Sequence, residues 1–419
     1  MVNPGYKQTE IGVIPDDWDV VSLNSLSIGG MQNGVFYEVD RKGFGVSFLN
    51  VGDLYGDTPI RSRALQKFNA TRNEIERFKI NSGDLFFTRS SIVPSGIAYC
   101  NWYHGSDEEV TVFDSHVVRF KTNLIKVVPM YLYLQCISPS SRKYFIANSK
   151  TATMTTIDQA VLGECQIALP LKKEQEKIAQ TISDIDCLIT NLEKLLTKKK
   201  AIKEGAMQEL LTGKRRLPGF DGEWVDLEIG KNGHLLRESI DPQAHPYVMF
   251  SEYSMPAFDD GQVAVKKYGS DMHSNRTVIC GSVLLFNKLN VRQKRIWLVN
   301  AIENNTVCSS EFLPYCSETI DLRFLQQLLS TEKATNDFIG MSTGTSNSQK
   351  RITPKNFLEY TVYVPRDINE QSAIADILLD MDSEASQLQQ TLEKYQLIKQ
   401  GMMSELLTGR IRLIDKEDA

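Results

Sequence analysis

The stretch FNKLNVRQKRIWLVN, at residues 286–300, carries four basic side chains and no acidic one. These are Lys288, Arg292, Lys294 and Arg295, and asparagine and glutamine side chains lie among them. Arg and Lys suit guanine edges and phosphates, whereas Asn and Gln suit adenine. The stretch therefore has the composition of a segment that reads a base sequence, and a solvated basic loop is the alternative.

Two polar loops add to this chemistry. SKTATMTTI occupies residues 149–157, and MSTGTSNSQKRI occupies residues 341–352. Their hydroxyl and amide side chains, with Lys150 in one loop and Lys350 and Arg351 in the other, could hold phosphates or base edges. Flexible connectors would be equally polar. The two loops recur at equivalent points of an internal repeat, however, and this recurrence favours binding.

No catalytic constellation accompanies these segments. Gly213-Lys214 lacks the upstream glycine loop and the Ser or Thr of a phosphate-binding loop, and no G-x-G-x-x-G follows a predicted strand. The histidines show neither metal-ligand spacing nor a fixed relation to Ser or Cys: His104, His116, His234, His245 and His273. The sequence gives no support for an enzyme, and no cofactor is expected on this chain.

Length and composition bound the class of protein. A chain of 419 residues suits two domains rather than one core. No apolar run approaches a membrane span and the first residues do not resemble a signal peptide, so a cytoplasmic protein without membrane contact is expected. The seven cysteines include no C-x-x-C pair, and buried, reduced thiols are expected. The net charge of -5 requires any nucleic-acid surface to be a local basic patch.

The chain contains an internal repeat. MQELLTGKRRL at residues 207–217 returns as MSELLTGRIRL at residues 403–413, with 196 residues between equivalent positions. The same shift aligns the two copies without a gap over about 40 residues. Glu174-Gln175 matches Glu370-Gln371 under this shift. A structural element of fixed length has therefore been duplicated.

Both copies are predicted to be long helices. The first has an apolar seam with the four-and-three spacing of a coiled coil: Ile178, Ile182, Ile185, Ile189, Leu192 and Leu196. The second keeps the spacing with softer side chains. Gly213 and Gly409 are placed to take the left-handed conformation that stops a helix. From Lys172 to Leu217 there are eleven basic and seven acidic residues, and from Asn369 to Leu413 four and seven, so the helices could pair.

The segments before the helices are predicted to be mixed α/β, with strands prominent. Residues 44–51 and 109–120 are rich in Val, Phe and Thr, whereas residues 128–145 are more helical. GDLFFTR at residues 83–89 corresponds to GSVLLFNK at residues 281–288. The layout is globular, helix, globular, helix. Two halves related by a pseudo-two-fold axis would place the helices antiparallel.

In this order, the motifs resemble the specificity (S) subunit of type I restriction-modification systems. The resemblance covers the whole chain. It is carried by TEIGVIPDDWDVVSL, PLKKEQEKIAQTISDID, VPRDINEQSAIADILLDMD, the twin ELLTG endings and GFDGEWVDLEIG. It implies two target recognition domains at residues 1–170 and 214–365, two conserved spacer helices at residues 171–213 and 366–413, and a tail at residues 414–419. The expected fold class is thus mixed α/β, with two tandem recognition domains separated by two long antiparallel coiled-coil helices.

The resemblance also implies partners. Such a subunit reads a bipartite target in double-stranded DNA and has no catalytic activity. It docks two adenine-N6 methyltransferase subunits, which would bind S-adenosylmethionine, and restriction subunits join that complex. A helix of about 40 residues is about 60 Å long, more than one ~34 Å turn of DNA, so both domains could face one side of the duplex. Leu210, Leu211, Leu406 and Leu407 are predicted to contact the two methyltransferase subunits.

By position, the DNA-facing loops of the family correspond to residues 88–91 with 151–156, and to residues 287–295 with 343–351. The predicted DNA-contacting residues of the first domain are Thr88, Arg89, Ser90, Ser91, Lys150, Thr151, Thr153 and Thr155. Those of the second are Asn287, Lys288, Asn290, Arg292, Lys294, Arg295, Thr343, Thr345, Asn347, Gln349, Lys350 and Arg351. The alternatives are a coiled-coil scaffold whose globular parts bind proteins, and a specificity adaptor of another DNA-modification or defence complex.

Overall fold

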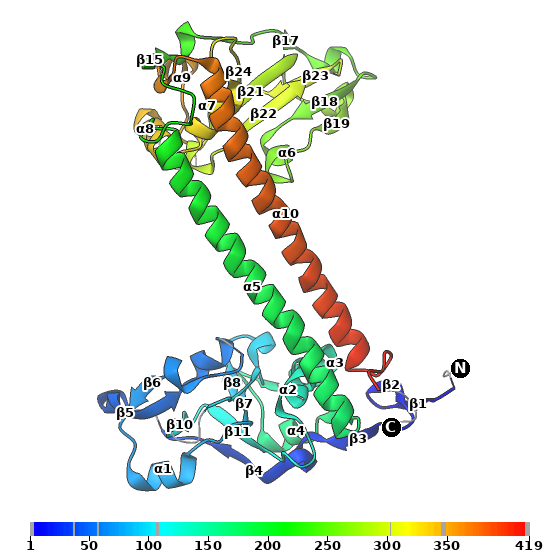
Figure 1. The fold of residues 1–419 in the computed structure, drawn as a ribbon. Helices are drawn as coiled ribbons and strands as arrows, with labels where there is room; N and C mark the ends of the chain where they lie inside the picture. Colours follow the sequence, from blue (N-terminus) through cyan, green and yellow to red (C-terminus); the bar gives the residue numbers. More distant parts are fainter. Residues whose placement is uncertain are drawn as a thin grey trace. The chain divides into compact units, whose positions relative to one another are not determined.

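The computed structural model describes residues 4–36, 38–56, 58–105, 109–301, 303–344 and 349–414. The chain forms two compact units: unit 1 combines residues 1–192 with 391–419, and unit 2 comprises residues 193–390. The predicted mixed architecture of helices and sheets is confirmed (Figure 1). Among the described residues, no helix has both the length and the apolar character needed to cross a membrane.

Two long helices, α5 (Lys172–Leu210) and α10 (Ile368–Leu406), contribute to both units, and each is 39 residues long. The other helices of unit 1 are α1 (Arg72–Phe78), α2 (Pro129–Ile137), α3 (Pro139–Ala147) and α4 (Gln159–Gly163). Its strands are β1 (Tyr6–Thr9), β2 (Gly12–Pro15), β3 (Asp19–Ser22), β4 (Ser27–Asn33), β5 (Lys42–Leu49), β6 (Gln66–Phe68), β7 (Leu85–Thr88), β8 (Ser90–Ser91), β9 (Cys100–Trp102), β10 (Thr111–Phe113), β11 (Val117–Thr122), β12 (Lys150–Thr151), β13 (Thr155–Thr156) and β14 (Gln166–Leu169).

Unit 2 contains a similar set of elements. Its other helices are α6 (Met255–Asp259), α7 (Leu322–Leu329), α8 (Glu332–Met341) and α9 (Pro354–Leu358). Its strands are β15 (Trp224–Glu228), β16 (His234–Leu235), β17 (Ser239–Ile240), β18 (Met249–Tyr253), β19 (Val265–Tyr268), β20 (Arg276–Val278), β21 (Gly281–Asn287), β22 (Ile296–Ala301), β23 (Thr306–Ser309), β24 (Phe312–Cys316) and β25 (Thr361–Pro365).

The two units share one sheet plan. A four-stranded sheet has the order β4-β11-β7-β9 in unit 1 and β16-β24-β21-β22 in unit 2. Its strands β7 and β21 come from the corresponding segments GDLFFTR and GSVLLFNK. The two-stranded sheets β14-β3 and β15-β25 also correspond. The repeat predicted from the sequence is therefore a repeat of topology as well.

The two long helices run antiparallel within each unit. In unit 2, Lys199 pairs with Glu384 at 2.6 Å and Lys203 with Asp382 at 2.5 Å, so residue numbers rise along α5 as they fall along α10. In unit 1, Lys399 of α10 pairs with Asp186 of α5 at 2.5 Å. Basic residues of α5 meet acidic residues of α10 in unit 2, as the net charges predict, whereas the signs are exchanged in unit 1.

The predicted seam is buried over most of α5 and half-buried over most of α10. Ile178, Ile182 and Ile189 are at most 9% exposed, whereas Met381 and Leu388 are half-buried. Both helices stop as expected, since Gly213 and Gly409 have φ values of 70° and 67°. A Cβ at Gly409 would lie 2.5 Å from the Pro15 ring, so this turn also needs the small residue for packing.

A buried carboxylate joins each helix start to the end of the other helix. Glu174 is 1% exposed, and it accepts hydrogen bonds from Arg412 Nε and Nη2 at 2.7 and 2.8 Å and from Trp18 Nε1 at 3.0 Å. Arg412 also binds Asp17, and the hydrogen bond lowers the pKa of the Asp17 carboxyl. In unit 2, Arg216 binds Glu370 through two hydrogen bonds of 2.7 and 2.8 Å. We call these two buried ion pairs the clamps: one joins Glu174 to Arg412 in unit 1, and the other joins Glu370 to Arg216 in unit 2.

The prediction that the cysteines are buried is wrong for three of the seven. Cys100, Cys136, Cys165 and Cys308 are buried and free, and burial raises the pKa of the Cys165 and Cys308 thiols to about 12. Cys187 and Cys280 are exposed, and Cys316 is half-buried. Cys187 lies on the side of α5 that faces away from the apolar seam, so the packing of the seam does not bury it.

We expect Arg412→Ala to lower the free energy of unfolding by about 3 kcal/mol, because it leaves the buried Glu174 charge unpaired. Chemical denaturation of the full chain would measure the change. Arg410→Ala is the matched control, since Arg410 pairs with Glu405 on the surface and should cost no more than about 0.5 kcal/mol. Equal losses for the two variants would show that the clamp does not stabilise unit 1.

Candidate nucleic-acid interface

The two predicted loops of the first domain form one small sheet in unit 1. Strands β12, β13 and β8 are ordered β12-β13-β8 and are all antiparallel. Ser91 lies opposite Thr155, and Ser90 lies opposite Thr156. The backbone also connects them at the next position, where Ile157 N donates to Arg89 O at 3.2 Å. Segments about 60 residues apart in the sequence are thus brought together in one sheet.

The two faces of this sheet differ in what they expose. Directly opposite residues of an antiparallel pair point to the same face. Ser91, Thr155 and Thr151 share the inner face, where Thr155 is fully buried and its hydroxyl lies 3.1 Å from that of Thr151. The outer face carries Ser90, Thr156 and Lys150 in one row. Thr156 is exposed and was absent from the predicted contacts, although it lies inside the predicted loop.

Two predicted DNA contacts of unit 1 are corrected by their burial. Thr88 is 0% exposed, its hydroxyl donates to Gly96 O at 2.8 Å, and Tyr99 N donates to it at 2.9 Å. Thr155 is equally buried. A hydroxyl that is buried and already bonded holds the loop in place and offers nothing to a ligand. The sequence could not distinguish these threonines from the exposed Thr151 and Thr153, because all four lie in short polar runs.

Arg89 is the exposed cation at the centre of the unit 1 interface. Among the described residues, its side chain has no ion-pair partner. It lines a hollow of about 490 Å³ together with Lys150, Thr156, Asn33 and Gln159. Gln159 Nε2 donates to Asn33 Oδ1 at 2.9 Å. Asn33 and Gln159 were missed, because Asn33 ends β4, far away in the sequence, and no local pattern connects it to Arg89.

The two predicted loops of the second domain also meet, in unit 2. Asn290 N donates to Lys350 O at 2.9 Å, and Ile352 N donates to Lys288 O at 2.9 Å. Arg351 bridges Leu289 and Thr343 through the backbone. The bond from Ile352 to Lys288 corresponds to that from Ile157 to Arg89 in unit 1. Thr343 and Gln349 are exposed on this loop, whereas Thr345 and Asn347 lie outside the described residues.

Three of the six predicted cations of unit 2 are paired with acids of the same unit. Lys294 binds Glu332 at 2.5 Å, and Arg351 binds Glu311 at 3.1 Å. Arg295 forms two hydrogen bonds with Asp259, of 2.8 and 2.7 Å. The acids come from α8, from the turn before β24 and from α6, so the acid-free sequence of residues 286–300 is not an acid-free surface.

These ion pairs shift the pKa values of the paired groups. The hydrogen bond from Arg295 lowers the pKa of Asp259, and the reciprocal bond raises the pKa of Arg295. The hydrogen bond to Glu311 likewise raises the pKa of Arg351. Within the described part of unit 2, the three other predicted cations have no such partner: Lys288, Arg292 and Lys350.

A constrained turn presents Arg292. Asn290 and Lys294 have φ values of 51° and 48°, the left-handed region, and they flank a short 3-10 turn, Val291–Gln293. Val291 is 9% exposed and anchors the turn, while Arg292 and Gln293 are exposed. The turn therefore holds a guanidinium and an amide outward on a fixed backbone.

Asn287 is corrected as a predicted DNA contact, since it is 3% exposed. Its Oδ1 accepts from Leu289 N at 2.9 Å, which caps the loop. Its Nδ2 has no hydrogen-bond partner among the described residues.

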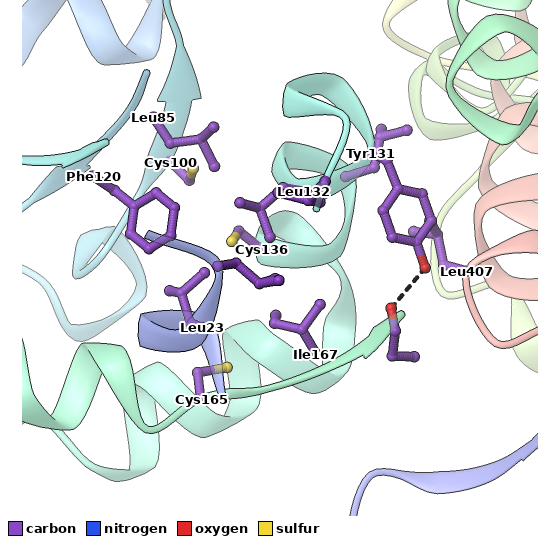
Figure 2. Close-up of a cluster of buried hydrophobic side chains, with 14 of the residues drawn as sticks. Leu23, Leu85, Cys100, Phe120, Tyr131, Leu132, Cys136, Cys165, Ile167 and Leu407 are labelled. Atoms are coloured by element: carbon purple, nitrogen blue, oxygen red, sulfur yellow. Dashed lines mark hydrogen bonds between the residues drawn. The ribbon is translucent and has the colours of Figure 1, made fainter. Parts of the chain in front are cut away.

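The four leucines predicted to contact partners lie inside the cores. Leu210 and Leu211 are 5% exposed in the core of unit 2, and Leu406 and Leu407 are 3% and 4% exposed in that of unit 1. Figure 2 draws Leu407 with Tyr131 and Leu132, and Gln135 Nε2 donates to Leu407 O at 3.0 Å. A partner docking here would meet the neighbouring residues rather than these side chains. The repeated ELLTG ending thus has a packing role within the chain.

The comparisons with known proteins agree with one another. Residues 15–204 match the family model of the type I restriction modification DNA specificity domain. MjaVIII, a type I restriction enzyme specificity subunit of Methanocaldococcus jannaschii, is 21% identical, and the match covers 96% of this chain and 94% of that protein. MjaX, a candidate specificity subunit of the same organism, is 24% identical over 97% of both chains.

Solved structures show the same fold. The type I restriction-modification S subunit from M. genitalium matches with a TM-score of 0.58 and 13% identity, over 97% of both chains. A chain from a structural study of assembly and conformational transition in the type I R-M system matches with a TM-score of 0.54 and 13% identity, over 95% of this chain and 99% of that one. The resemblance to type I restriction-modification specificity subunits that the sequence motifs indicate is thereby confirmed.

Proposed function

We propose that the chain is a DNA-recognition subunit that reads a bipartite target, with one unit for each half-site. The proposal rests on one observation. In each unit, two polar loops are joined by an equivalent backbone hydrogen bond, from Ile157 to Arg89 in unit 1 and from Ile352 to Lys288 in unit 2. Duplicated interfaces suit a target made of two separate parts.

The cations of the two interfaces that have no ion-pair partner among the described residues support DNA as the ligand. Arg89 and Lys150 in unit 1, and Lys288, Arg292 and Lys350 in unit 2, are available to phosphates and guanine edges. DNA binding is compatible with the net charge of -5, because only the two reading surfaces need to be basic. The hydroxyl groups of Ser90 and Thr156 would add hydrogen bonds to bases or phosphates.

The chain would work as part of a complex in the cytoplasm. Its relatives are named as subunits of type I restriction enzymes, and one structural match comes from a study of complex assembly. We propose that two adenine-N6 methyltransferase subunits dock on this chain and that restriction subunits join through them. Catalysis and S-adenosylmethionine binding would belong to these partners, and the specificity chain would supply the sequence reading.

The lengths of α5 and α10 would set the gap between the half-sites. Both helices have 39 residues, and cross-pairs between them recur with one register: Lys203 with Asp382, and Asp186 with Lys399. Because the two helices pair along their lengths, a change in the gap would require matched changes in both.

Exchanging residues 19–169 for the equivalent segment of a relative should change one half-site only. These boundaries move the paired strands β3 and β14 together and leave Trp18 with Glu174. Methylation-aware sequencing of DNA from cells that express the complex would give the motif. The reciprocal exchange of residues 225–365 should change the other half-site, and an unchanged motif would favour a scaffold whose globular parts bind proteins.

Arg292→Ala should weaken binding to the target duplex by about 1 to 3 kcal/mol and relax specificity at one position, if the guanidinium reads a guanine. Arg295→Ala should cost less, because Asp259 already neutralises Arg295. Titration of the complex with duplexes carrying single base changes would measure both effects. Arg366→Ala, an exposed position outside the predicted interface, is the control. Equal weakening on every sequence would make Arg292 a phosphate contact.

Deleting residues 189–195 together with 390–396 should shorten the unspecified gap by about three base pairs. Each deletion removes seven residues, about 10.5 Å of helix, against about 3.4 Å per base pair. The deleted segments face each other in the register of the ion pairs, so Asp186 keeps Lys399 and Lys203 keeps Asp382. Methylome sequencing would report the gap, and a gap of unchanged length would refute the role of the helices as a ruler.

A further inference from the structure

Three apolar side chains project from the unit 1 interface. Ile92 is 85% exposed, Val93 is 54% exposed and Met154 is 43% exposed. We call these three residues the apolar tip. Single exposed apolar residues are common on protein surfaces and need no explanation. Three of them at one edge of a polar, basic interface are a feature that the proposed function does not explain.

The apolar tip lies where the paired strands of the small sheet end. Ser91, the last residue of β8, lies opposite Thr155, the first residue of β13. Ile92 and Val93 follow Ser91 directly, and Met154 directly precedes Thr155, so both parts of the apolar tip adjoin the same end of the sheet. The loop that carries Ile92 is tied back where Val93 N donates to Ser91 Oγ at 3.3 Å. The apolar tip is therefore held beside the exposed polar row.

The corresponding turn of unit 2 has different chemistry. There the apolar Val291 is 9% exposed and points into the unit, while Arg292 and Gln293 are exposed. Unit 1 thus presents apolar and hydroxyl groups where unit 2 presents a guanidinium and an amide. Two reading surfaces of such different composition suit different base pairs.

In the major groove, the apolar group that distinguishes one base pair from another is the C5-methyl of thymine. Guanine and adenine present polar atoms there, which suit side chains such as those of Arg292 and Gln293. The apolar tip has nothing to offer those atoms, but it can cover a methyl group. Arg89 and Lys150, beside it, can hold the adjacent phosphates.

We infer that the apolar tip reads thymine methyl groups, so that Ile92 or Met154 contacts the C5-methyl of at least one thymine in the half-site of unit 1. This inference rests on the proposed function and names the base chemistry read by one of its two interfaces. Val93 lies at the edge of the contact and excludes water from it. The half-site read by unit 2 should depend on guanine and adenine edges instead.

Deoxyuridine tests the inference, because it differs from thymidine only in lacking the C5-methyl group. The target motif is first determined by methylome sequencing, and the half-site of unit 1 is identified by the exchange of residues 19–169. The wild-type complex with its methyltransferase subunits is then titrated with duplexes in which single thymines are replaced by deoxyuridine. We expect about a four-fold loss of affinity for each contacted methyl, the effect of uncovering one apolar carbon. Replacements in the half-site of unit 2 should have no such effect.

The variant Ile92→Ser tests whether the Ile92 side chain is the group that contacts the thymine methyl. The variant should bind the thymine duplex less tightly and should no longer distinguish it from the deoxyuridine duplex. Ile125→Ser is the matched control, because Ile125 belongs to unit 1, is also 85% exposed and lies outside the interface. It should keep the full four-fold preference for thymine. Because both isoleucines are exposed, neither change should disturb the core.

The outcomes separate the inference from the function on which it rests. Wild-type binding that is indifferent to deoxyuridine throughout the half-site of unit 1 overturns the inference while sequence-specific binding remains. Loss of the preference in both Ile92→Ser and Ile125→Ser also overturns it. Ile92→Ser that keeps the preference but loses a methyltransferase subunit makes the apolar tip a protein contact. Absence of any sequence preference in the complex would instead overturn the proposed function.

Discussion

The structure depends on two buried carboxylates, those of Glu174 and Glu370, whose side chains are each 1% exposed. An ion in such a position is costly unless its hydrogen bonds are complete and its charge is matched. Arg412 and Trp18 supply this for Glu174, and Arg216 supplies the charge for Glu370. Each arginine follows the end of one long helix, and each glutamate lies in the first turn of the other. The clamps thus decide where each helix must start and stop.

This constraint accounts for the ungapped repeat. Glu174 precedes Arg216 by 42 residues, and Glu370 precedes Arg412 by the same number. Two antiparallel helices can satisfy both clamps and keep their ion pairs in register only if their lengths match. An insertion in one helix alone would displace a buried charge from its partner. The equal lengths of the two copies of the repeat therefore follow from electrostatics. The leucines of ELLTG are constrained by the cores in which they pack.

The sequence predicted the features that follow from local periodicity. Helix spacing, the glycine stops and the matching strands of Leu85–Thr88 and Gly281–Asn287 could all be found in this way. The repeat also marked equivalent loops in the two units, and in each unit the structure joins the two loops by backbone hydrogen bonds. It failed where burial and pairing depend on distant segments. Nothing near Arg295 in the sequence reveals Asp259, and nothing in a run of threonines reveals that Thr155 is buried while Thr156 is exposed.

Pairing within the interface has a consequence for specificity. A cation held by an acid of its own unit must give up that partner before it can bind a phosphate, so in the proposed complex Arg295, Lys294 and Arg351 would contribute less attraction to DNA than their charges suggest. They instead fix the loops, and the strained turn around Arg292 gains rigidity from Lys294 and Glu332. In the proposed complex, the cations that have no acidic partner among the described residues would act from a preorganised backbone. Because general attraction would be limited and the geometry fixed, discrimination between base sequences would fall to a few exposed side chains, such as Ile92 in unit 1 and Arg292 in unit 2.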